Sequence, residues 1–320
     1  MTLDAPADLL DRRLLIVTGK GGVGKTTTAA ALAQLAADRG KRTLVCELDA
    51  KGNLASFLEC GPTQFTPREV NHNLFAMSMD SEESLREYLS LQLRLPLLVR
   101  IGPLNRIFEY VATAAPGVRE ILTIGKLVWE VRERHWDLIV VDGVASGHIV
   151  GQLTAPQSIN DLVSVGLIRQ QTDWMLEILG DPALTGLVIT ATPEEMPVNE
   201  TLELAARLRA ETNVELAAVV VNRVLPELFG RREETLFGAL NTPDRRAEIG
   251  EAAGGSIDHL MEAASLAVAL RRGSAEHLER LRAELDRTVP MLYVPYLFMR
   301  SHGMRATRMV ATALSAELGY

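Results

Sequence analysis

Cysteine is scarce in this chain, long apolar runs are missing, and positive charge is in deficit. A chain of 320 residues needs no disulfide to stabilise its core, and two cysteines, Cys46 and Cys60, are typical of a reducing compartment. No run of 18 apolar residues occurs, so the sequence predicts no membrane-spanning helix. The segment Met1–Asp4 is acidic and leads almost at once into a strand, so we expect no signal peptide and a cytoplasmic protein.

The deficit of positive charge bears on nucleic-acid binding. The formal net charge is −8, with 33 Lys and Arg against 41 Asp and Glu. Bulk binding of nucleic acid needs clustered basic residues that displace counterions. The arginine pairs are scattered instead, and we interpret them as solvated surface at 12–13, 231–232, 245–246 and 271–272. We therefore expect no nucleic-acid partner.

Short apolar runs are abundant, and each has about the length of a buried strand. Several are rich in Val, Ile and Leu without alternation, which is typical of strands covered on both faces of a parallel sheet. Helical stretches such as Thr26–Arg39 and Thr201–Ala210 separate many of them. The alternation predicts an α/β fold with a doubly wound, mainly parallel sheet. The predicted strands are Leu14–Thr18, Thr43–Leu48, Leu74–Met79, Asp137–Val141, Gly186–Ala191, Leu216–Asn222 and Met291–Val294.

Two segments depart from this alternation of strands and helices. Residues 81–135 are leucine-rich and helical, and residues 226–288 are charged and mostly helical. We expect a single domain over residues 1–320, in which these two segments are insertions that pack beside the sheet as a helical subdomain. The leucines of 85–111 either form an apolar groove for a client helix or pack against the core as most apolar helical stripes do.

The strongest motif follows the first predicted strand. A full match to G-x-x-x-x-G-K-[ST] stands between a strand and a helix and reads Gly19-Lys20-Gly21-Gly22-Val23-Gly24-Lys25-Thr26. The glycines let backbone N–H groups turn toward phosphates, and the helix N-terminus adds about half a positive charge. Lys25 is predicted on the β- and γ-phosphates, the Thr26 hydroxyl on Mg²⁺, and Thr27 near the α-phosphate. The motif predicts a P-loop NTPase that binds ATP and Mg²⁺ through Gly19, Gly21, Gly22, Val23, Gly24, Lys25, Thr26 and Thr27.

Lys20 is a second feature of this loop, because an ordinary P-loop requires no lysine directly after its first glycine. A lysine at this rim points away from its own phosphate cradle and can reach the nucleotide of a facing subunit. A cation supplied in this way stabilises transition-state charge, as arginine fingers do. We therefore predict a catalytic role for Lys20 in a dimer.

With these residues the loop resembles the deviant Walker A of a known group of ATPases. Two further segments narrow the resemblance to the arsenical-pump and tail-anchored-protein-targeting branch: Asp49–Leu54 is similar to its first switch and Asp142–His148 to its second. The resemblance covers about residues 12–310. Smaller similarities lie at 115–120, at 192–194 with 200–201, at 221–223 and at 294–296.

The resemblance implies roles for further residues. Asp49 is expected to polarise the attacking water, and Asp142 to hold Mg²⁺ through water. Gly147, together with Gly143, is expected near the γ-phosphate. Adenine is expected to contact Asn222 and Pro295. Two of these residue types also have ordinary structural uses, since Asp49 suits a helix N-cap and Asn222 suits a turn.

The chain also departs from the branch in its switches and its thiols. The first switch has Ala50 and Gly52 in place of Pro and His, and the second has Gly143 and Ala145 in place of Thr and Pro. These substitutions are expected to alter the flexibility of the two switches and the rate of ATP turnover. Arsenite binding needs several thiolates, and a dimer-bridging zinc needs a Cys-x-x-Cys pair. The sequence has neither, so we expect no arsenite site and no zinc site.

The resemblance implies an ATPase that hydrolyses Mg-ATP and couples its nucleotide state to a client, such as a membrane protein, or to a partner. The dimer would be a homodimer or a heterodimer with a paralogous ATPase. The altered switches leave two alternatives: a regulatory or scaffold subunit that binds ATP with little turnover, and an arsenite-transport accessory ATPase without the metalloid thiols. A partitioning ATPase acting on DNA or a membrane surface fits least, because the tail at 305–318 has few basic residues.

Overall fold

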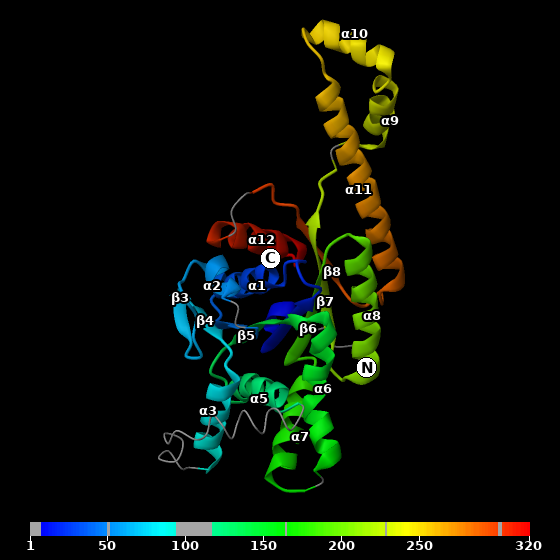
Figure 1. Ribbon diagram of the computed structural model, residues 1–320. Coiled ribbons are helices and arrows are strands. Elements are labelled where there is room, and N and C mark those ends of the chain that lie inside the picture. Colours follow the sequence, from blue (N-terminus) through cyan, green and yellow to red (C-terminus); the bar gives the residue numbers. More distant parts are fainter. Residues whose placement is uncertain (1–7, 50–51, 94–116, 164, 228, 300–302) are drawn as a thin grey trace.

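The computed structural model describes residues 8–49, 52–93, 117–163, 165–227, 229–299 and 303–320. A single eight-stranded sheet lies at its centre (Figure 1), in the order β3-β4-β2-β5-β1-β6-β7-β8. Neighbouring strands pair in parallel except β3 with β4, which are antiparallel. The strands are β1 (Leu14–Gly19), β2 (Thr43–Glu47), β3 (Arg68–Asn71), β4 (Leu74–Ser78), β5 (Leu138–Ala145), β6 (Thr185–Ala191), β7 (Leu216–Val224) and β8 (Met291–Pro295).

The predicted α/β fold is confirmed, and each of the seven predicted strands is present within a few residues of its expected bounds. The sequence did not reveal β3, which lies at one edge of the sheet. It has four residues, and none of them is buried, so it lacks the apolar run that marks the other strands. β5 extends four residues beyond its predicted end at Val141, and this places Asp142 inside the strand rather than after it.

Alternate residues of the strands face two separate layers of helices. Leu14 and Ile16 of β1 belong to the core under α5, α6, α7 and α8, whereas Leu15 and Val17 belong to the core under α1, α2 and α12. Both layers bury the sheet, as the unbroken apolar runs predicted. The helices are α5 (Val118–Arg132), α6 (Ser146–Leu162), α7 (Leu167–Gly180) and α8 (Glu195–Glu211) on one side, and α1 (Lys25–Asp38), α2 (Asn53–Leu58) and α12 (Met304–Glu317) on the other.

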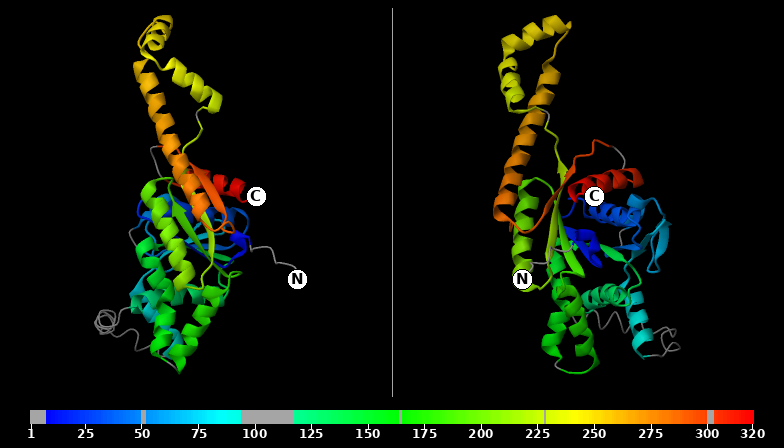
Figure 2. Two further views of the ribbon diagram at one scale, coloured as in Figure 1. Left: turned by 90° about the vertical axis from the view of Figure 1, so that its right-hand side faces the viewer. Right: turned by 180° about the vertical axis from the view of Figure 1, so that it is seen from behind.

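The two helical segments expected beside the sheet lie at opposite ends of the molecule (Figures 1 and 2). α3 (Ser81–Leu93) and α5 pack together with α6 and α7 at one end. At the other end, α9 (Arg231–Leu240), α10 (Pro243–Ala253) and the 27-residue α11 (Asp258–Glu284) form an arm. Leu278 and Leu281 of α11 are buried near α8, while α9, α10 and the first part of α11 project beyond the sheet.

A short 3-10 helix, Leu9–Asp11, precedes β1. Among the described residues, no helix combines the length and apolar character that a membrane crossing requires.

Candidate nucleotide-binding site

The glycine loop connects the end of β1 to the start of α1 at the carboxyl edge of the sheet. Gly19, Gly22 and Gly24 have φ values of 145°, 85° and 101°, which L side chains rarely adopt. Close contacts also require glycine at two of these positions. A Cβ on Gly19 would lie 2.1 Å from the carbonyl oxygen of Thr190, and one on Gly24 would lie 2.3 Å from the Asn222 amide nitrogen. The loop therefore packs directly against β6 and β7.

Thr26 and Asp142 meet beneath this loop. The Thr26 hydroxyl, in the first turn of α1, donates a hydrogen bond of 2.6 Å to Asp142 Oδ2 on β5. Asp142 is 6% exposed, and its other oxygen, Oδ1, is buried without a hydrogen-bond partner in the described residues. Burial raises the pKa of Asp142 to about 6; the hydrogen bond from Thr26 opposes this shift, and the nearby Glu47 carboxylate adds to it.

The raised pKa of Asp142 predicts a pH dependence of stability. The folded protein keeps this proton up to about pH 6, whereas an unfolded chain releases it near the ordinary pKa of 3.8. The contribution of Asp142 to stability should therefore fall by about 2–3 kcal/mol for two pKa units as pH rises between these values, in addition to the contributions of the other carboxyl groups. Urea unfolding without metal or nucleotide measures this decline. Asp142→Asn should lack it, whereas exposed Asp244→Asn should keep it; equal declines in all three proteins would contradict the assignment.

Both lysines of the loop have contacts within the chain. Lys25 Nζ donates to the backbone carbonyl of Lys20 at 3.2 Å, so its cation lies over the loop itself. Lys20 Nζ instead forms an ion pair of 2.7 Å with Glu200 on α8. The second Glu200 oxygen accepts a 3.1 Å hydrogen bond from Ser146, the first residue of α6. Glu200 thus connects the loop to the predicted second switch.

Two acidic residues stand at the end of β2, beside Asp142. Asp49, the predicted water-polarising residue, lies two residues beyond the strand and is exposed. Its charge is close enough to raise the pKa of Asp142. Glu47 is the last residue of β2 and is 2% exposed. Glu47 is not among the site residues predicted from the sequence, although a charged residue at the end of an apolar strand was an available signal.

The two glycines of the second switch have different surroundings. Gly147 lies exposed in the first turn of α6, where an added Cβ would meet nothing within 4 Å. Gly143 lies inside β5, where an added Cβ would be 2.6 Å from the carbonyl oxygen of Val17. The close approach of β1 is therefore sufficient to explain Gly143. A role near the γ-phosphate stays a prediction for both.

The predicted adenine contacts come from the last two strands of the sheet. Asn222 on β7 is buried, and its amide nitrogen donates to the Val23 carbonyl at 2.8 Å. Its amide oxygen accepts from the Arg223 N–H at 2.9 Å. Asn222 therefore braces the glycine loop, a role that spacing alone did not indicate. Pro295 ends β8 and is exposed. Adenine binding by either residue stays a prediction.

The residues present fit a magnesium nucleotide. Mg²⁺ prefers oxygen ligands and is usually held by one or two carboxylates with phosphates and water. The Thr26 hydroxyl and the buried, unpartnered Asp142 Oδ1 supply such oxygens next to the loop. The loop itself supplies backbone N–H groups at the start of a 14-residue helix, where an anion is stabilised.

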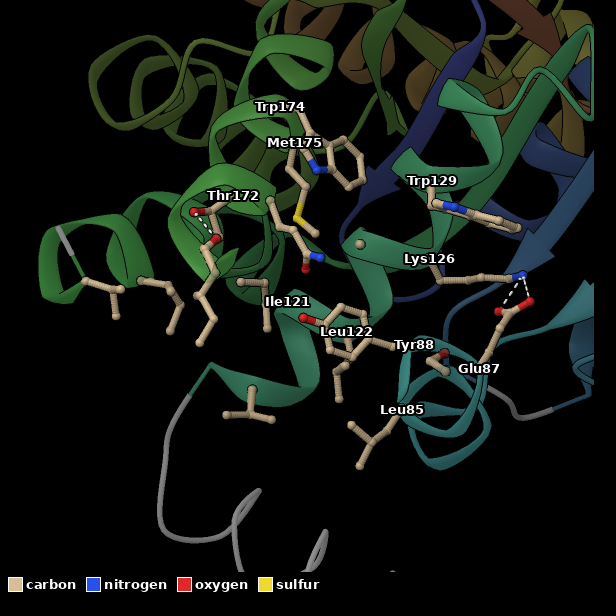
Figure 3. Close-up of a pocket in the computed structure, with 17 residues that line it drawn as sticks. Leu85, Glu87, Tyr88, Ile121, Leu122, Lys126, Trp129, Thr172, Trp174 and Met175 are labelled. Carbon is tan, nitrogen blue, oxygen red and sulfur yellow. Dashed lines mark hydrogen bonds and ion pairs between the residues drawn. The ribbon is translucent and has the colours of Figure 1, made fainter. Parts of the chain in front are cut away.

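A separate apolar cavity of about 300 Å³ lies among α3, α5, α6 and α7 (Figure 3). Trp129, Trp174 and Met175 are among its apolar walls, and no residue of the glycine loop lines it. At one rim Lys126 is paired with Glu87 at 2.6 Å. Leu85 of the leucine-rich segment 85–111 lines the cavity. Residues 94–111 of that segment lie outside the described residues, so both a groove for a client helix and packing against the core stay predictions for the segment.

A glycine loop connects a strand to a helix at the carboxyl edge of a parallel sheet, and Thr26 of that helix donates a hydrogen bond to Asp142 on another strand. These features define the P-loop class of nucleotide-binding proteins. The family described as "Anion-transporting ATPase" matches residues 12–175 and 166–236. The chain belongs to this anion-transporting ATPase family, and the resemblance to arsenical-pump and tail-anchored-protein-targeting ATPases is confirmed.

Individual relatives support the same membership. ATPase BagA of Mycobacterium tuberculosis is 30% identical over 232 residues, which cover 69% of this chain and 68% of that protein. ATPase ARSA2 of Chlamydomonas reinhardtii is 27% identical over 274 residues, 72% of this chain and 73% of that protein. ATPase ASNA1 homolog 1 of Paramecium tetraurelia is 32% identical over 162 residues, 47% of each chain.

Proposed function

We propose that this protein is a Mg²⁺-dependent, dimeric ATPase whose nucleotide state controls the binding of a client or partner protein. The observation that carries the proposal is the pairing of Thr26 with Asp142 directly beneath a glycine loop whose first and last glycines admit no side chain. Family membership supplies the ATPase class, and the geometry supports the individual roles. The proposed place of action is the cytoplasm, where ATP and Mg²⁺ are abundant.

The chain's own residues divide the chemistry between them. Lys25 and the loop N–H groups bind the phosphates, and Thr26 and Asp142 hold the metal, Asp142 through water. When bound, Mg²⁺ supplies neutralisation of the charge that develops on the phosphate oxygens. Asp49 orients and polarises the attacking water, since its exposed carboxylate stands at the same sheet edge.

In the proposed dimer, the Lys20 side chain extends across the interface to the nucleotide of the partner subunit. The ion pair with Glu200 is consistent with this movement, because both side chains are about one-third exposed and such pairs contribute only about 0–1 kcal/mol. A bound nucleotide in a facing subunit would offer Lys20 stronger anions. Release of Glu200 would then free Ser146 and alter the start of α6.

α6 offers a route from the nucleotide site to the apolar cavity. Its first residue, Ser146, contacts Glu200 beside the loop, and Ile159 near its other end lines the cavity. α6 has 17 residues and spans about 25 Å, with Pro156 inside the helix shortly before Ile159. A shift of the second switch would therefore change the cavity, where we place the client or partner surface.

A phosphate-release assay tests the hydrolytic part of the proposal. Wild-type protein should release phosphate from ATP only with Mg²⁺, and Lys25→Ala should abolish both release and ATP binding, since Lys25 contacts the transferred phosphate. Lys41→Ala is the matched control, because Lys41 pairs with Asp11 away from the loop. Binding of ATP by the wild type without any Mg²⁺-dependent release would favour the regulatory or scaffold alternative instead.

A further inference from the structure

Glu47 is a buried carboxylate whose two oxygens have different surroundings. It stands opposite Asp142 in the parallel pairing of β2 with β5. Its Oε1 accepts a 3.0 Å hydrogen bond from the backbone N–H of Asn53, the first residue of α2. Its Oε2 is buried and has no hydrogen-bond partner among the described residues. The backbone N–H groups of Gly52 and Leu54 also interact with this carboxylate, so its protein partners lie at the start of α2 while Oε2 is left without one.

An unpartnered carboxylate oxygen is costly to bury, and this site contains two of them. Asp142 Oδ1 is buried without a partner as well, on the residue registered against Glu47. Both atoms are acceptors, so each needs a donor or a cation. The waters that remain on Mg²⁺ in a protein site are such donors, and Asp142 is already the residue assigned to contact them.

We propose that Glu47 is a second carboxylate of the metal site: its Oε2 accepts a hydrogen bond from a water of the Mg²⁺ shell while its Oε1 holds the first turn of α2. The proposal rests on the proposed Mg-nucleotide site. Glu47 then connects the metal, through that water, to the Asn53 N–H at the start of α2, within the predicted first switch. Metal binding orders this backbone through one side chain, which makes Glu47 a positioning residue for the switch.

A purely structural role of Glu47 would need Oε1 alone. The Glu47→Gln variant distinguishes this structural role from the proposed role in the metal site. Its amide oxygen can still accept from Asn53, but its amide nitrogen donates and cannot accept a hydrogen bond from a metal-bound water. Mn²⁺ binding in the presence of saturating ADP, followed by the EPR signal of free Mn²⁺, is the measurement. Loss of an outer-shell carboxylate typically weakens metal affinity by about 10–100-fold.

We expect Glu47→Gln to weaken Mn²⁺ binding by about tenfold or more and to leave metal-free ADP binding within about twofold. The matched control is Glu279→Gln, which removes the same charge from an exposed position on α11. Unchanged Mn²⁺ affinity in Glu47→Gln would overturn the proposal. If the wild type itself bound neither ADP nor Mn²⁺ with ADP, the proposed function would fail instead, so the two failures are distinguishable.

A measurement on the wild type keeps the proposal testable even where the variant fails to fold. Hydrogen exchange of a peptide covering 52–58 is compared in ADP with Mg²⁺ and in ADP with EDTA. Because Glu47 connects the metal shell to Asn53 N–H, metal should slow exchange there by about threefold or more. Exchange that does not depend on metal in this peptide would contradict the connection.

Discussion

Lys20→Ala is expected to reduce ATP turnover by about 10³-fold while ATP affinity stays within about threefold, since cations that act on a transferred phosphate from a facing subunit contribute factors of this size. The physical reason is the position of Lys20, whose side chain leaves the loop and pairs with Glu200 on α8 rather than lying over the phosphate cradle as Lys25 does. Its loss should therefore leave phosphate binding in place. Steady-state phosphate release and fluorescent-nucleotide titration measure the two quantities.

Two further variants separate the cation of Lys20 from its ion pair. Glu200→Gln removes the pair but keeps the cation, so its turnover should fall by less than about tenfold, in line with a partly exposed pair. Lys20→Arg keeps a cation of similar reach and should recover part of the rate. A Lys20→Ala protein with turnover within error of the wild type would contradict the catalytic role.

Asp49→Asn is expected to slow hydrolysis by about 10²–10⁴-fold, the range that a positioned acid or base contributes. The amide is similar in size, so phosphate and metal contacts from Lys25, Thr26 and Asp142 should persist. The variant should therefore bind ATP and retain it intact. Isolation of the ATP complex by gel filtration, followed by the amount of ATP left over time, measures the single-turnover rate.

A comparison with Asp244→Asn controls for loss of one negative charge, because Asp244 is exposed in the first turn of α10, on the arm. Wild-type rates of hydrolysis in Asp49→Asn would mean that another group orients the water. If instead the variant did not bind ATP, Asp49 would belong to the binding of phosphate or metal rather than to the chemical step.

The fold could be predicted from the sequence wherever a local signal was strong. Residues 14–17 of β1 and 44–46 of β2 are buried on both faces of the sheet, and such burial favours the unbroken apolar runs that the sequence displays. The glycine loop was equally clear, because Gly19 and Gly24 are required by contacts that no side chain permits. The edge strand β3 lacks buried residues and carries no such signal.

The parts of the site that escaped prediction depend on contacts between distant segments. Glu200 and Ser146 are 54 residues apart, and Asn222 reaches Val23 across 199 residues, so spacing along the chain does not reveal either pair. Glu47 became informative only once the register of β2 with β5 placed it opposite Asp142. The positions of α3 and α5 at one end of the molecule and of α9, α10 and α11 at the other were likewise not indicated by the composition of these segments.

The central claim is that each active site combines Asp49 of one subunit with Lys20 of the other, and mixed dimers test it most directly. Lys20→Ala and Asp49→Asn subunits, carrying different affinity tags, are co-expressed and purified through both tags. One site in each mixed dimer then contains an intact Asp49 and receives an intact Lys20, so turnover should be about half that of the wild type, although each parent variant is nearly inactive. Mixed dimers as inactive as their parents, or a failure to isolate any mixed dimer with ATP and Mg²⁺, would contradict the claim.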